Sequence, residues 1–160
     1  MTTEYKDYIV FLKKYRDELN VALSNEREKR VALLNSDFES LEAMLQIQQA
    51  ETMKLKSFES KRATYQEKLG FENRTAKEIV SSIGDAEVRK ELGNLFIEIV
   101  EIVNRIKEQN KLALELANTN LRLLDRVFNN TEYSAQNGLY SPDSNKQNSF
   151  SKGSSFKEIV

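Results

Sequence analysis

The stretch from Asp85 to Asn129 constrains the fold most, because its apolar residues keep a helical spacing over its whole length. It contains no Pro and a single Gly, Gly93. Side chains spaced three and four residues apart lie along one face of an α-helix. About 45 residues at roughly 1.5 Å each predict a helix on the order of 65 Å long. The apolar positions of this first stripe are Leu92, Leu95, Ile99, Ile102, Ile106, Ala113, Leu116, Leu123 and Val127.

A second apolar stripe runs beside the first. Together the two stripes form an apolar face that is wider than a two-stranded coiled coil needs. A helix of this length cannot cover such a face by itself, so the sequence predicts that it packs against more than one neighbour. The second stripe consists of Phe96, Val100, Val103, Leu114, Ala117, Leu121, Leu124 and Phe128.

Two helices of similar length are predicted upstream. The first covers residues 3–34 and the second residues 38–69, and the short connection between them indicates an antiparallel hairpin. Both carry apolar residues at intervals of three and four, but polar residues interrupt the stripe of the second helix at Gln48, Thr52 and Arg62. We therefore expect the second helix to be less buried than the first.

Local signals place the turn of this hairpin. We interpret the charged stretch 26–30 as a solvated part of one continuous first helix. Asn35 is expected to take the left-handed conformation that ends a helix. Ser36, with Glu39 three residues later, fits a capping box that would start the second helix.

After the hairpin, the sequence predicts a short helix and then the long one. Thr75 is expected to cap the short helix over 76–83, and Asp85 to cap the long helix over 86–129. The fold class is therefore all-α, an elongated three-helix bundle or coiled coil over residues 1–129. Residues 130–160 are rich in Asn, Ser, Gly, Gln and Lys, a composition that predicts a flexible, disordered tail.

Charge and hydropathy restrict the class of partner. The chain has 24 basic and 25 acidic residues, and they are interspersed. This distribution provides no strongly basic face for phosphate backbones, so we expect no nucleic acid partner. No apolar run approaches the roughly 20 residues of a membrane span, and no export signal is evident at the N-terminus. We expect a cytoplasmic protein with no membrane insertion.

The residue inventory argues against catalysis. The chain has no His and no Cys, so neither a nucleophile activated by His nor a thiolate metal site can be built. Its five Gly residues are scattered and form no phosphate-binding loop. The sequence therefore predicts no enzymatic activity, no cofactor and no metal.

Two Asn residues, Asn110 and Asn120, interrupt the apolar stripes of the long helix. A buried Asn can fix the register between packed helices, as it does in coiled coils. Alternatively, the apolar surface after Asn110 faces a different and wetter partner. The sequence leaves both interpretations open.

Several segments of the last helix and of the stretch after it resemble the FlgN family of flagellar export chaperones. These segments are Glu108-Gln-Asn-Lys-Leu-Ala-Leu114, Asn118-Thr-Asn-Leu121, Leu123-Leu124, and Tyr133-Ser-Ala-Gln-Asn-Gly138. The hairpin, connector, long helix, Tyr-containing turn and polar tail also follow the order of that family. The chain departs from the family pattern at Ala113, where a Leu is usual, and at Ser134, which replaces the first Gly of the turn.

The resemblance implies a cytosolic type III export chaperone. Such a chaperone binds the C-terminal segments of the hook–filament junction proteins FlgK and FlgL, prevents their premature assembly, and delivers them to FlhA of the export gate. Tyr133 is the candidate residue for docking at the gate. The candidate cargo-binding residues are Asn110, Leu112, Leu116, Asn120, Leu121, Leu124, Val127 and Phe128.

Two other functions agree equally well with wide apolar stripes. The chain could be a structural coiled coil that self-associates and has no client. It could also be a chaperone or adaptor for a different export substrate, which the sequence pattern alone does not distinguish.

Overall fold

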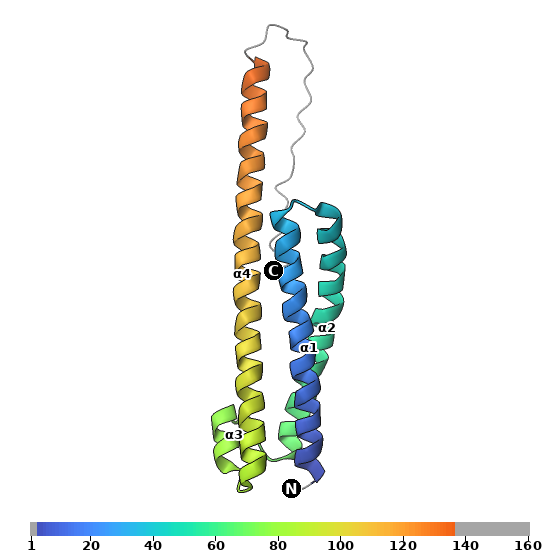
Figure 1. The fold of residues 1–160 in the computed structure, drawn as a ribbon, viewed down its shortest axis with the longest axis vertical. Coiled ribbons are helices and arrows are strands. Elements are labelled where there is room, and N and C mark those ends of the chain that lie inside the picture. The colour runs from blue at the N-terminus through green and yellow to red at the C-terminus, as the bar shows by residue number, and fades with distance from the viewer. Residues whose placement is uncertain (1–2, 137–160) are drawn as a thin grey trace.

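Helical periodicity governs the fold, as the sequence predicts. The computed structural model describes the backbone of residues 3–136 and the side chains of residues 3–130, and this part of the chain contains four helices and no strand. Helices α1 (Thr3–Leu34) and α2 (Phe38–Lys68) form an antiparallel hairpin (Figure 1). The short α3 (Ala76–Ser82) leads into the long α4 (Ala86–Gln136). The predicted all-α class is confirmed.

Helix α1 contacts both of the other long helices. It packs against α2 on one side and against α4 on the other, while α3 packs against the beginning of α4. Helices α2 and α4 make no close backbone contact with each other over their described residues. The expectation that the long C-terminal helix has more than one neighbour is correct, but its neighbours are α1 and α3.

The hydrophobic core lies between α1, α3 and α4. Its most completely buried side chains are Tyr8, Leu12, Ile79, Val88 and Leu92. Full burial of an aliphatic or aromatic side chain stabilises a fold by about 1.5–3 kcal/mol. Helix α1 is therefore held to α3 and α4, which come more than 40 residues later in the sequence, by a small number of well-covered residues.

Helix α2 covers α1 mainly through aromatic rings. Phe11 and Tyr65 stack with their ring centroids 4.9 Å apart, and Tyr15 and Phe58 stack at 5.5 Å. The only fully buried residue of α2 is Gln66. The expectation that the second helix is less buried than the first is confirmed.

The hairpin turn differs in detail from its prediction. Ser36, not Asn35, has the left-handed conformation, with φ of 52°, because the Asn35 amide still donates to Val31 in the last turn of α1. The amides of Ser36 and Asp37 then donate to Leu33 and Ala32, which is the Schellman arrangement that ends many helices. As a result Asp37, not Ser36, becomes the N-cap of α2, and its carboxylate accepts from the Ser40 amide at 3.1 Å.

The caps of the last two helices agree with their predictions. Thr75 and Glu78 form a reciprocal capping box at the start of α3, with the Thr75 amide donating to Glu78 at 2.7 Å. Asp85 Oδ1 accepts from the amides of Glu87 and Val88 at the start of α4. These bonds satisfy amides that have no partner within the helix.

Helix α4 is longer than predicted. It continues to Gln136, whereas the sequence indicated an end near residue 129. Asn and Thr lower helix stability by less than about 1 kcal/mol each relative to Ala, and the first strong helix breaker after Gly93 is Gly138. Residues 130–136, predicted to belong to a flexible tail, are thus helical, and residues 137–160 lie outside the described part of the chain. No helix within residues 3–136 has the length and apolar character needed to cross a membrane.

Candidate functional site

The long helix extends well beyond the hairpin (Figure 1). Helix α4 has 51 residues and α1 has 32. Both begin at the same end of the molecule, so the difference in length means that α4 extends roughly 28 Å past the end of α1, at about 1.5 Å per residue. We call this part of α4, from Asn120 onwards, the overhang.

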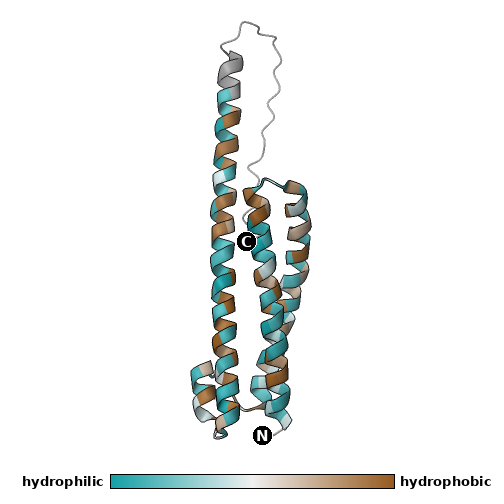
Figure 2. Ribbon diagram, in the orientation of Figure 1, coloured by the Kyte–Doolittle hydropathy of each residue, from teal (hydrophilic) through white to brown (hydrophobic). Residues whose placement is uncertain are grey.

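Apolar residues continue from the packed part of α4 into the overhang without a change of spacing. Ala113, Ala117, Leu121, Leu124 and Phe128 follow one another at intervals of three and four residues, which keeps them on one face of the helix. The same apolar bands run along α4 both beside the hairpin and above it (Figure 2).

The exposed fraction of the side chains on this face rises along the helix, although the residues remain apolar. Ala113 is 3% exposed, whereas Leu121 is 44% exposed and Phe128 67%. The reason is that α1, which covers the face of α4, ends at Leu34. The apolar stripe is thus longer than the element that buries it.

The boundary between the two parts lies at Asn120. Its side-chain Nδ2 donates to the carbonyl oxygen of Leu33 at 3.3 Å. The Leu33 carbonyl already accepts from the Ser36 amide in the turn, and Asn120 gives it a second hydrogen bond. This contact fixes the level at which α4 passes the turn of the hairpin.

A buried polar layer lies below that boundary. Glu26 and Lys29 of α1 are each only 7% exposed, and the Lys29 ammonium lies 2.8 Å from the Glu26 carboxylate. The same ammonium donates to Gln48 Oε1 of α2 at 3.1 Å and to Asn110 Oδ1 of α4 at 3.2 Å. We call these four residues the polar layer, and it connects all three long helices.

The polar layer corrects the expectation that the stretch 26–30 is solvated. The first helix is continuous there, as predicted, but two of its charged residues point inward. A sequence signal for this existed, since Leu19, Ala22, Glu26 and Lys29 keep the three–four spacing of the apolar stripe. A charged residue at a stripe position is buried when a partner of opposite charge and further hydrogen bonds are available.

A second carboxylate lies next to this layer. Asn25 Nδ2 donates to Glu51 Oε1 at 2.9 Å. Burial raises the pKa of Glu51, and the nearby carboxylates of Glu26 and Glu18 act in the same direction. The hydrogen bond from Asn25 and the charge of Lys29 partly offset this rise.

The candidate residues therefore fall into four groups. Asn110 and Asn120 are bonded within the chain, an arrangement that fits the register interpretation. Leu112 and Leu116 are half-buried beside the hairpin. Tyr133 lies on α4, but its side chain is outside the described part. The exposed members, all on the overhang, are Leu121, Leu124, Val127 and Phe128.

Sequence reasoning missed two exposed apolar residues at the base of the overhang. Leu34 is 58% exposed and Phe38 is 69% exposed, and they flank the hairpin turn whose Leu33 carbonyl accepts from Asn120. Their position at the boundary could not be seen without the register between α1 and α4. The apolar surface thus includes both the overhang and the tip of the hairpin.

This apolar surface can pack against the apolar face of a partner. Described residues that could act as metal ligands (His, Cys, Asp or Glu) form no group of three or more. An amphipathic helix lying against the overhang would bury apolar area on both partners. The arrangement is that of a docking surface.

Comparison with known proteins gives one finding. A family model described as "FlgN protein" matches residues 5–148 of the chain. No curated protein and no solved structure matches it. The matched range includes nearly all of the described helices and the entire overhang.

Proposed function

The chain belongs to the FlgN family of flagellar export chaperones, and we propose that its overhang binds the C-terminal segments of the hook–filament junction proteins FlgK and FlgL. One observation carries the proposal: Ala113 is buried and Leu116 and Ala117 are partly buried where α1 lies opposite them, whereas the apolar residues beyond Asn120 are exposed. In this proposal a cargo helix covers the face of α4 that α1 leaves exposed.

The physical need for such a surface comes from the cargo. A segment that packs as a helix in the assembled flagellum has an apolar face, which would drive premature association before export. An amphipathic helix is recognised by anchors at three–four spacing in an apolar groove or on an apolar face. Leu121, Leu124 and Phe128 present anchors at this spacing over the described part of the overhang.

We further propose that Tyr133 takes part in delivery to FlhA at the export gate. Its place on α4 supports this, because along the helix it comes after the exposed apolar residues Leu121 to Phe128. A Tyr133→Ala chain should bind cargo normally but deliver less of it to the secretion pathway. A chaperone with this role works in the cytoplasm, before the cargo enters the export gate. Normal secretion at native expression would remove Tyr133 from this role.

Direct titration tests the cargo assignment. The full chain is titrated calorimetrically with the purified C-terminal segment of FlgK, and separately with that of FlgL. We expect saturable binding with a negative change in heat capacity, the mark of buried apolar surface. If neither segment binds at concentrations of about 1 mM, where interactions of only about 4 kcal/mol are detected, the assignment is wrong.

The same surface could instead pair two copies of the chain. Sedimentation equilibrium with and without the cargo segment separates these functions. A dimer that dissociates when the segment is added agrees with the proposal. A dimer that persists, with no segment bound, would support the client-free coiled coil.

A further inference from the structure

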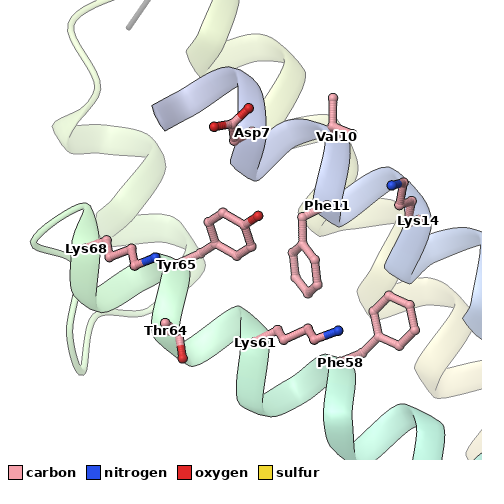
Figure 3. A pocket seen from close by; sticks show the side chains of 9 residues that line it. All are labelled: Asp7, Val10, Phe11, Lys14, Phe58, Lys61, Thr64, Tyr65 and Lys68. Carbon is pink, nitrogen blue, oxygen red and sulfur yellow. The ribbon is translucent and has the colours of Figure 1, made fainter. Parts of the chain in front are cut away.

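A groove lies between α1 and α2 at the end of the hairpin that is farthest from the overhang (Figures 1 and 3). Its volume is about 510 Å³, within the range of roughly 300–1,000 Å³ that is usual for binding clefts. The groove is lined by Asp7, Val10, Phe11, Lys14, Phe58, Lys61, Thr64, Tyr65 and Lys68.

The floor of the groove is aromatic and fixed in place. The ring of Phe11 stacks on Phe58 with centroids 5.7 Å apart and on Tyr65 at 4.9 Å. Phe11 is buried, while Val10 is about half exposed at the rim. Stacked rings offer a large apolar contact area that loses little conformational entropy on binding.

The rim of the groove is positively charged. Lys14, Lys61 and Lys68 are exposed, and over the described residues none of the three forms an ion pair. Other lysines of the same two helices do, since Lys13 pairs with Glu91 at 2.6 Å and Lys54 with Glu18 at 2.7 Å. The rim therefore carries three uncompensated cations.

A single carboxylate faces these cations. Among the described residues, Asp7 is the only acidic one that lines the groove, although the chain as a whole has a net charge of −1. The positive charge is thus local to the groove. Its complement is a negatively charged partner, because opposite potentials favour encounter and fix orientation.

We propose that this groove is a docking site for an acidic peptide segment that carries a bulky apolar side chain. The apolar side chain rests on Phe11, Phe58 and Tyr65, and the flanking carboxylates lie over the lysines of the rim. The site is at the opposite end of the molecule from the overhang (Figure 1), so cargo and this second partner can be held at the same time.

A defined peptide tests the proposal on the full chain. The probe is a fluorescein-labelled peptide that repeats Glu-Glu-Phe-Leu three times. Its binding to the full chain is measured by fluorescence anisotropy in low salt. Two control peptides replace every Glu by Gln, or every Phe and Leu by Ser. We expect the acidic apolar peptide to bind, both controls to bind at least about tenfold more weakly, and affinity to fall as salt rises from about 50 to about 200 mM.

Matched variants locate the binding. Lys61→Glu/Lys68→Glu should weaken binding of the probe by at least about tenfold. Lys56→Glu/Lys107→Glu makes the same change of charge at two exposed positions that do not line the groove, and it should leave affinity unchanged. Circular dichroism of each variant confirms that the helices remain formed.

A second pair of variants tests the apolar part without touching the floor. Val10→Ser removes an exposed apolar group at the rim, and Val21→Ser removes one of nearly equal exposure elsewhere on α1. Only Val10→Ser should weaken binding of the probe. Leu121→Ser/Leu124→Ser should leave it unchanged, so the outcome is independent of the cargo surface.

Three results would overturn the proposal. The first is absence of binding of the probe at about 1 mM in low salt. The second is equal affinity of the wild-type chain and the Lys61→Glu/Lys68→Glu chain. The third is tighter binding of a thymidine oligonucleotide or of phosphatidylglycerol vesicles than of the peptide, since the groove would then recognise phosphate and not carboxylate.

Discussion

Replacing Leu121 and Leu124 together by Ser should weaken cargo binding about 30-fold while the helices stay folded. Leu121 is 44% exposed and Leu124 is 46% exposed, so somewhat less than half of each side chain is available to a partner. Full burial of a Leu contributes about 1.5–3 kcal/mol, and the available part is therefore worth about 1 kcal/mol per residue. The pair then contributes about 2 kcal/mol to binding, or about 30-fold in Kd.

The assay compares this variant with a matched control on the same helix. Ile97 and Val100 have the same three-residue separation, and both are more than half exposed, but they lie beside the hairpin and not on the overhang. Binding of the FlgK C-terminal segment is followed by fluorescence anisotropy, and helix content by circular dichroism. We expect the rise in Kd for Leu121→Ser/Leu124→Ser alone, with Ile97→Ser/Val100→Ser close to wild type.

Three outcomes would contradict the reasoning, each in a different way. If helix content is retained and the Kd does not change, the overhang is not the cargo surface. If helix content collapses, the two Leu residues support the fold of α4 more than their exposure indicates. Equal loss of affinity in both variants would mean that the effect comes from any polar change on α4.

Three further predictions concern the folded chain alone. Leu92→Ala, in the core, should lower the free energy of unfolding by about 2–5 kcal/mol in urea denaturation, because it leaves a cavity. Lys29→Ala should cost about 3–5 kcal/mol because it leaves Glu26 buried without its cation, and Glu26→Leu/Lys29→Leu should recover much of that loss. Burial and the adjacent Glu59 raise the pKa of Tyr15 to about 12. The protonated Tyr15 side chain therefore contributes fully to the stability of the fold below pH of about 10, and this contribution is lost as pH rises from about 10 to about 12. Thermal melts in this pH window should show a weaker pH dependence for Tyr15→Phe than for the wild-type chain.

The local parts of the fold could be predicted from sequence because they depend on neighbours in the chain. The bounds of α1, the capping box at Thr75 and the cap at Asp85 follow from periodicity and from side chains within one helical turn. The sequence predicts an end of α4 near residue 129, which is too early, because the Asn-rich composition that follows is typical of a flexible tail. Composition alone is a weak helix breaker where Gly and Pro are absent.

The parts that depend on the register between helices could not be predicted. The sequence indicates that α4 has surplus apolar surface, and the exposed stripe beyond the hairpin agrees with this. It does not indicate that Leu116 is half-buried and Leu121 exposed, because the boundary is set by where α1 ends beside α4. For the same reason the burial of Glu26 and Lys29 was missed, since their partners Gln48 and Asn110 come from other helices.

The polar layer and the overhang are connected through this register. A buried ion pair is weak evidence for stability, but buried polar groups can select one alignment of helices. Lys29 reaches both Gln48 and Asn110 in a single alignment of α1, α2 and α4. A slip of one turn would move about four residues of α4, and with them about one residue of the stripe, past the end of α1. We infer that the layer determines which residues of α4 are left uncovered for cargo. The Glu26→Leu/Lys29→Leu chain separates the two roles: its stability should recover while its cargo affinity falls, and unchanged affinity would show that the register is set elsewhere.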